Sequence, residues 1–161
     1  MKKLFFSALM LLSMSLAVNA QKITSNGPDA LEWQFKRCYV KGDKCIVDLI
    51  VTNAGKKDLT LKVFTYPNGY GNGISAYDDE GNVYSPDNVS GQFGGKDFGS
   101  NDCMVQIPRD VTLKMRVQLS DFDEFATSIK VLKIAMFKNT DDTTPYYGFE
   151  VQVKDIPVTR E

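Results

Sequence analysis

Residues 33–63 read WQFKRCYVKGDKCIVDLIVTNAGKKDLTLKV, and this stretch decides the fold. Two turn signals, Lys41-Gly42-Asp43 and Asn53-Ala54-Gly55, divide it into three short runs rich in β-branched and aromatic residues. Runs of this kind between glycine-containing turns are typical of consecutive antiparallel strands. The stretch therefore predicts three strands, over residues 31–39, 44–53 and 58–64.

The second of these runs is apolar on both of its sides. Its odd-numbered residues from Cys45 to Val51 form one side, whereas Ile46 and Ile50 lie on the other side around Asp48. Successive side chains of a strand point to opposite faces of the sheet, and strands that are apolar on both faces lie in the interior of covered sheets. We therefore expect this run to be a central strand with cover on both faces.

Later segments repeat the strand pattern, and no window shows a helical apolar stripe. Residues 111–119 alternate apolar and polar side chains, and 128–137 and 147–154 are further strands, with a small hairpin at 74–77 and 83–84. This pattern predicts an all-β, immunoglobulin-like antiparallel β-sandwich with about seven principal strands plus a small edge hairpin. A small β-barrel or jelly roll is the alternative. The predicted single domain spans 31–157, and residues 21–30 are predicted to be a flexible leader.

The first 20 residues have the composition of a secretory signal peptide. Lys2 and Lys3 precede an apolar stretch, and Val18-Asn19-Ala20 resembles a cleavage site. The apolar stretch is shorter than the ~20 residues that span a bilayer, which disfavours a membrane anchor. We therefore expect an exported protein that is periplasmic or extracellular. We also expect it to be non-lipidated, because no cysteine follows Ala20 directly. No later segment is apolar enough to predict a transmembrane span.

Charge argues against several classes of partner. The whole chain has a net charge of −1, and removing Lys2 and Lys3 from its 19 basic residues leaves 17 against 20 acidic ones. Proteins that bind nucleic acid generally carry a basic excess that meets the phosphates. The sequence therefore predicts no nucleic-acid partner and no electrostatic attachment to an anionic membrane.

The chain contains no histidine, which removes many catalytic devices. Serine triads, histidine-activated cysteines and the usual catalytic zinc sites all depend on imidazole. A glycoside hydrolase needs only two carboxyl groups about 5–10 Å apart, so a carboxylate-dependent enzyme remains as an alternative. No motif pairs two acids, and we expect a protein that is not an enzyme.

Three cysteines, Cys38, Cys45 and Cys103, leave at least one thiol without an intramolecular partner. Cys38 and Cys45 flank one predicted turn, so a cross-hairpin disulfide is one reading. A three-residue loop at 41–43 would instead place Tyr39 opposite Cys45. Buried free thiols are therefore an equal alternative, and the role of Cys103 stays open.

The region 66–102 differs from the rest of the chain, since it contains eight of the twelve glycines. Long loops in compact domains frequently carry function, and exposed aromatic rings provide contact area at low entropic cost. The candidate ligand-binding residues are Tyr66, Tyr70, Tyr77, Tyr84, Phe93 and Phe98.

Clustered oxygen ligands in the same region suggest calcium, the one cofactor for which the sequence offers candidates. Asp78, Asp79, Glu80 and Asn82 lie together, and calcium takes six to eight oxygen ligands. The spacing is not that of an EF-hand loop. Acidic residues and glycine also form solvated turns without any metal, and this reading is favoured.

Several strings are similar to one group of known domains. They are the stretch from Cys45 to Leu61, the string from Tyr77 to Tyr84, and Ile107-Pro108 followed by Val111. Together with the closing Lys154-Asp155-Ile156-Pro157, these resemble small secreted immunoglobulin-like domains of unknown function from Gram-negative gut bacteria. The resemblance implies the sandwich fold and no catalytic residues.

The function predicted from the sequence is that of a non-catalytic exported binding module, with region 66–102 as the recognition surface. Its partner would be a protein or a carbohydrate that the sequence does not identify. One alternative is a structural or assembly subunit that acts by edge-strand pairing or through a free cysteine. The other is a carboxylate-dependent glycoside hydrolase.

Overall fold

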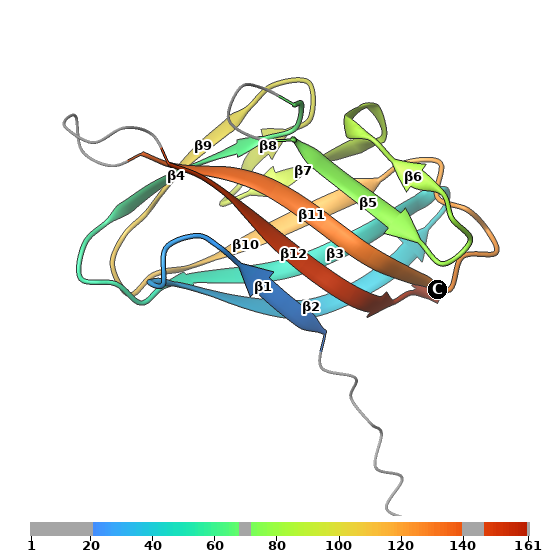
Figure 1. Ribbon diagram of the computed structural model, residues 1–161, viewed down its shortest axis with the longest axis horizontal. Helices are drawn as coiled ribbons and strands as arrows, with labels where there is room; N and C mark the ends of the chain where they lie inside the picture. The colour runs from blue at the N-terminus through green and yellow to red at the C-terminus, as the bar shows by residue number, and fades with distance from the viewer. Residues whose placement is uncertain (1–20, 68–71, 140–146, 161) are drawn as a thin grey trace, which may run out of the picture.

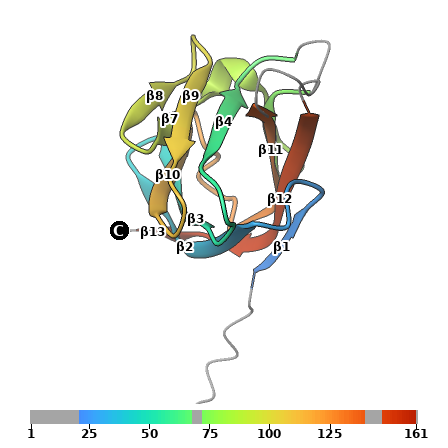
Figure 2. The same ribbon diagram turned by 90° about the vertical axis from the view of Figure 1, so that its left-hand side faces the viewer.

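The computed structural model describes residues 21–67, 72–139 and 147–160 of the chain. Within these ranges it contains two packed β-sheets and one short 3₁₀ helix, η1 (Pro86–Asn88). The two layers form a sandwich, in which strands of one sheet cross those of the other (Figure 1), and the end-on view separates them (Figure 2). The predicted all-β sandwich is confirmed, and the barrel alternative is wrong because the strands divide into two sheets with separate edges.

The seven-stranded sheet is built around one long strand. β11 (Ser128–Asn139) pairs on one side with β12 (Tyr147–Pro157), which pairs in turn with β1 (Lys22–Ser25). On its other side β11 pairs first with β5 (Ile74–Asp78) and then with β4 (Leu59–Phe64). β9 (Cys103–Ile107) pairs with β4, and β6 (Val83–Tyr84) pairs with β5.

The six-stranded sheet has the order β13-β2-β3-β10-β7-β8. Its strands are β13 (Thr159–Arg160), β2 (Leu31–Lys41), β3 (Lys44–Asn53), β10 (Thr112–Leu119), β7 (Val89–Phe93) and β8 (Lys96–Phe98). All neighbours are antiparallel except β13, which runs parallel to β2. The central position of β3 confirms the prediction made from its apolar pattern.

The β2–β3 hairpin turns in two residues rather than the predicted three. Lys41 pairs with Lys44, so that only Gly42 and Asp43 form the loop. Gly42 has φ of 64°, the left-handed conformation that glycine adopts without cost at the first central position of a type II′ turn. The shorter loop places Val40, not Tyr39, opposite Cys45.

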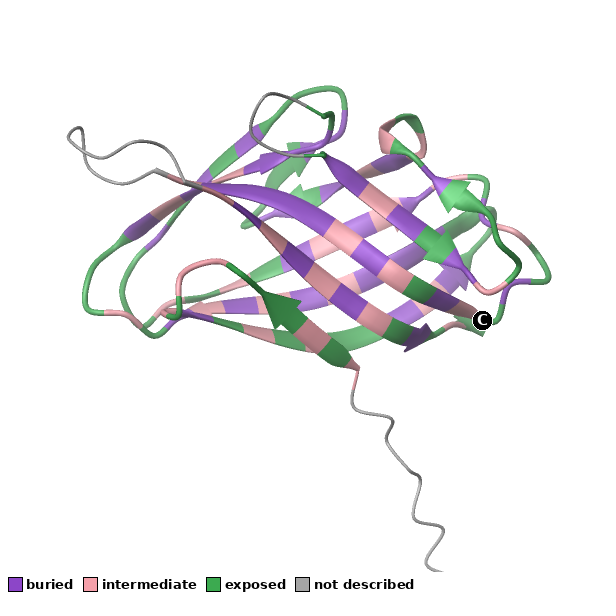
Figure 3. Ribbon diagram, viewed as in Figure 1, coloured by how far each residue is buried: buried purple, intermediate pink, exposed green. Residues whose placement is uncertain are grey.

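The core lies between the inner faces of the two sheets (Figure 3). Val47, Leu49 and Val51 of β3 are almost fully buried there, and Leu132 and Ile134 of β11 belong to the same core cluster. Within the described residues no second sheet lies over the outer side of β3, where Ile46 is buried but Asp48 and Ile50 are only half-buried. The expectation of cover on both faces is therefore wrong for the outer face.

Three further expectations need correction. Residues 22–25 of the predicted flexible leader form β1, because β12 offers them an unpaired edge. Residues 159–160, beyond the predicted end of the domain at 157, form β13 beside β2. The expected long loops after Tyr84 contain β7, β8 and β9.

Candidate functional site

A row of polar side chains crosses the outer face of the six-stranded sheet. Cross-strand register places Arg37 of β2 and Arg116 of β10 on either side of Asp48 in β3. The same register continues from Arg116 to Gln92 of β7 and then to Asp97 of β8. These five residues, here called the polar row, point outward because their neighbours in each strand point into the core.

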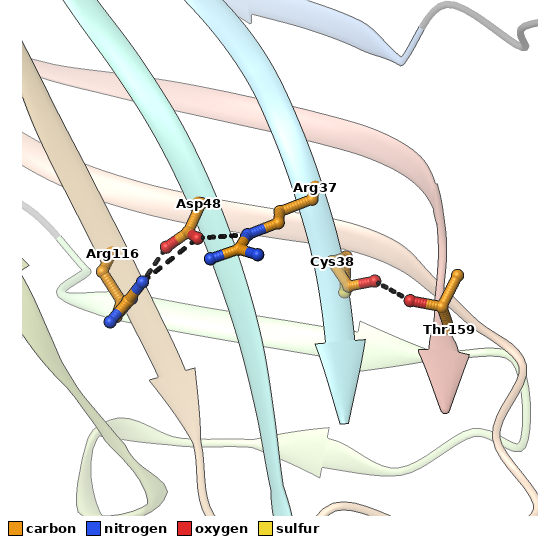
Figure 4. Close-up of polar contacts among 5 residues, drawn as sticks. All are labelled: Arg37, Cys38, Asp48, Arg116 and Thr159. Atoms are coloured by element: carbon orange, nitrogen blue, oxygen red, sulfur yellow. Dashed lines mark hydrogen bonds and ion pairs between the residues drawn. The ribbon is translucent and has the colours of Figure 1, made fainter. Parts of the chain in front are cut away.

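Asp48 holds the two arginines of the polar row by direct ion pairs. Arg37 donates from Nε to Asp48 Oδ2 over 2.8 Å. Arg116 donates from Nε to Oδ1 over 2.7 Å and from Nη2 to Oδ2 over 3.2 Å, a two-bond contact (Figure 4). Arg37 also lies over the ring of Tyr39, with Cζ 4.6 Å from the ring centroid. Both guanidinium groups are therefore oriented by contacts within the sheet.

The ion pairs set the protonation of these groups. Burial by itself raises the pKa of Asp48, but the hydrogen bonds and charges of Arg116 and Arg37 outweigh it and hold the pKa below its ordinary value. The hydrogen bonds to Asp48 in turn raise the pKa of Arg37 and of Arg116. All three residues are consequently charged at neutral pH, with one net positive charge.

A hollow of about 470 Å³ lies over this part of the sheet. Its form follows from side-chain length: Asp48 and Ile50 on β3 are short, whereas the flanking strands carry long cationic side chains. The lining residues are Lys36, Arg37, Asp48, Leu49, Ile50, Gln92, Gly95, Lys114 and Arg116. Four cationic side chains and one carboxylate give the lining a net charge of +3.

The chemistry of the hollow suits binding of an anion. Arg37 and Arg116 lie two strands apart, about 10 Å at the backbone. Neither Nη atom of Arg37 donates to a partner in the residues that the structure describes. A guanidinium group can donate two parallel hydrogen bonds to two oxygens of one carboxylate or phosphate. The only carboxylate among the lining residues is that of Asp48, which is ion-paired.

Three of the predicted ligand-binding aromatics are core residues instead. Phe93 is fully buried and Phe98 almost so, because β7 and β8 turn these side chains inward. Tyr84 is also buried, stacks on Phe122 with ring centroids 5.3 Å apart, and donates its hydroxyl to Asp78 Oδ2 over 2.9 Å. The prediction that these three present a contact surface is wrong, since their rings are not accessible.

The other predicted aromatics do not form one surface with them. Tyr66 is exposed and donates its hydroxyl to Asp87 Oδ1 over 3.2 Å. Tyr77 is exposed beneath the ammonium group of Lys133, which lies 5.8 Å from the ring centroid. Tyr70 lies outside the described residues.

The predicted calcium residues form a hydrogen-bonded turn. Asp78 accepts the N–H groups of Glu80 and Asn82 at Oδ1, and the Asn82 amide at Oδ2. Asp79 accepts the N–H groups of Thr127 and Ser128, and these bonds connect the β5–β6 turn to the start of β11. Among the described residues, no three acidic or cysteine side chains are grouped so that they could hold a metal ion. The calcium site remains a prediction that no such group of ligands in the described residues supports.

The hydrogen bonds also shift the pKa values in this turn. Burial opposes the ionised forms of Asp78 and Asp79, yet the donors from Asn82 and Thr127 lower both pKa values. Burial and the Asp78 carboxylate raise the pKa of Tyr84 to about 12. Hydrogen bonds within this part of the fold thus orient the side chains of Asp78, Asp79 and Tyr84.

Cys38 and Cys45 are free thiols with their sulfur atoms 3.4 Å apart. They lie on diagonal rather than facing positions, since Cys38 pairs with Val47 and Cys45 with Val40. The thiol contact and burial raise the pKa of Cys38, and burial raises that of Cys103. All three thiols are buried, so none is available on the surface to link two chains.

A second hollow, of about 270 Å³, contains the acids Asp121 and Asp123. Asp121 accepts the Asn88 amide over 3.3 Å, and Asp123 accepts the amide of Asn82 and the N–H of Phe125. Both carboxylates thus connect loops of the fold.

Sequence reasoning did not single out Arg37, Asp48 or Arg116 as a site. One signal was present, the lone acid inside the apolar run of β3, opposite a strand with Lys114 and Arg116 on its polar side. What the sequence does not supply is the pairing of β3 with β10, which brings residues 68 positions apart into contact.

No family model and no curated protein matches this chain. Among solved structures, a family 123 glycoside hydrolase from Clostridium perfringens is similar with 8% identity and a TM-score of 0.39. The match covers 80% of this chain but only 28% of that one. AvmM, which catalyses macrocyclisation in alchivemycin A biosynthesis, shows 9% identity and a TM-score of 0.23 over 86% of this chain and 91% of that one. The resemblance to gut-bacterial immunoglobulin-like domains stays a prediction.

The described residues form no helix with the length and apolar character that a membrane span requires.

Proposed function

We propose that this protein is a non-catalytic, exported binding module that takes an anionic ligand in the hollow on the outer face of the six-stranded sheet. The observation that carries the proposal is the pair of guanidinium groups fixed by Asp48, with Lys36 and Lys114 in the same lining. Side chains held in place before binding lose little entropy when a ligand arrives.

The position of the site differs from the one expected from the sequence. Region 66–102 supplies only Gln92 and Gly95 to the hollow, and Phe93 and Phe98 pack inward. The proposed ligand site therefore lies on the charged face of β2, β3 and β10, and not on the tyrosine-containing segments. The proposal keeps the predicted class, a binding module without catalysis.

The two alternatives receive less support. A free-cysteine link between chains would need an exposed thiol, and the three cysteines are buried. Edge-strand pairing retains β1 as a candidate, because its outer edge has no partner strand within the described part of the chain. For a hydrolase, the hollow offers Asp48 alone, and its carboxylate is paired with two arginines.

Retention on beads that carry carboxylate groups tests the proposal, with uncharged beads of the same matrix as reference. Although the chain is acidic overall, we expect retention at low salt that the double variant Arg37→Gln/Arg116→Gln loses. The matched control is Lys56→Gln/Arg109→Gln, which removes the same charge from exposed positions outside the hollow. Equal loss in both double variants, or no retention of the unmodified protein, would contradict the proposal.

A further inference from the structure

The polar row carries acceptor atoms next to its cationic pair, and this combination narrows the ligand class. We propose that the hollow binds a carboxylated sugar, with its carboxylate at Arg37 and Arg116 and a neighbouring hydroxyl group at Gln92. The inference rests on the proposed function and specifies the ligand of the same site.

The donor side of the row suits a carboxylate. The contact between Arg116 and Asp48 shows how a carboxylate binds here, because Nε and Nη2 of Arg116 donate to the two carboxylate oxygens of Asp48. These bonds leave Nη1 of Arg116 and both Nη atoms of Arg37 for an incoming group. Lys36 and Lys114 add charge to the same lining without a fixed bond to Asp48.

The acceptor side of the row suits hydroxyl groups. Gln92 donates from Nε2 to Asp97 Oδ1 over 2.8 Å, which fixes the orientation of its amide and leaves Oε1 as an acceptor. Both side chains are exposed; Gln92 lines the hollow, and Asp97 lies opposite it on β8. Phosphate and sulfate offer acceptor atoms almost alone, whereas a sugar hydroxyl both donates and accepts. A ligand with one carboxylate and neighbouring hydroxyls therefore uses both the arginines and the adjacent Gln92.

The surroundings disfavour other anionic partners. β3 and β10 are paired on both sides, so a peptide cannot add as a strand at this place. The charged residues of the lining sum to +3 in a chain of net charge −1, so the remaining residues carry −4. A densely charged polymer would meet repulsion outside the hollow. A ligand whose charge is confined to single carboxylates does not.

Titration with three small probes and, for comparison, an acidic phosphopeptide, followed by calorimetry or nuclear magnetic resonance, tests the inference. The probes are the methyl glycoside of glucuronic acid, methyl glucoside with similar hydroxyls but no charge, and acetate with the charge alone. We expect the uronide to bind about tenfold more tightly than acetate, as one or two added hydrogen bonds would give. Methyl glucoside should not bind measurably.

Two variants distinguish sugar recognition from anion binding alone. Gln92→Ala should reduce uronide affinity about tenfold, to that of acetate, while Arg37→Gln/Arg116→Gln should remove binding of both. Equal affinity for acetate and uronide, an unaffected Gln92→Ala variant, or tighter binding of an acidic phosphopeptide would overturn the sugar inference and leave anion binding standing. Absence of binding by every charged probe would overturn both.

Discussion

Asp48 is the residue on which the order of the polar row depends, because it fixes one arginine on each side. Replacing it with asparagine removes two charge-assisted contacts while keeping the side-chain shape. Both arginines are partly exposed, with 58% and 38% of their side-chain surface accessible, so solvent screening limits the gain from each contact. We expect Asp48→Asn to lower the free energy of unfolding at pH 7 by about 1 kcal/mol.

The same substitution has a pH signature. The pKa of Asp48 is lower in the folded than in the unfolded protein, so its contribution is present above the unfolded value of about 4 and is lost as the pH falls below it. Urea unfolding at pH 7 and at pH 3 should therefore show a difference between variant and unmodified protein that shrinks at pH 3. A difference of the same size at both pH values would show that Asp48 acts without its charge.

At the scale of elements, the turn after β3 depends on a buried amide. Asn53 is fully buried, donates from Nδ2 to the carbonyl groups of Lys57 and Ile107, and accepts the N–H of Gly55. These bonds join the β3–β4 turn to the end of β9. Asn53→Ala leaves the carbonyl of Ile107 and its neighbours without partners, so we expect a loss of about 2–3 kcal/mol in urea unfolding.

Asn88→Ala provides the control for this prediction. The amide of Asn88 makes one exposed bond, of 3.3 Å, to Asp121. Its removal should change the free energy of unfolding by less than about 0.5 kcal/mol. Comparable losses in the two variants would mean that the buried amide of Asn53 has no special part in joining the sheets.

The sequence predicts best those strands whose side chains follow a clear apolar pattern along the chain. The strands at 44–53 and 111–119 appear almost at the expected bounds, because alternation of side chains is a local property. β1 and β13 lack such alternation and form because β12 and β2 provide edges. The β7–β8 hairpin had a signal, Gly94-Gly95, whose positive φ values fit a type I′ turn.

At the scale of the molecule, the site could not be read from the sequence because its residues come from separate strands. Composition predicts an acidic protein, yet the sheet gathers four cationic side chains into one hollow. Burial of Phe93 and Phe98 likewise depends on which side of a strand faces the second sheet, and glycine-rich composition does not supply that. The fold was therefore largely predictable, whereas the site depends on strand pairing.

The central claim is that anions bind over β2, β3 and β10, and backbone amide resonances during an acetate titration test it most directly. With sodium chloride as the reference salt, we predict saturable shifts confined to residues around Arg37, Asp48 and Arg116, absent in Arg37→Gln/Arg116→Gln and retained in Lys56→Gln/Arg109→Gln. Shifts centred on Tyr66 and Tyr77, or no saturable shift, would contradict the account.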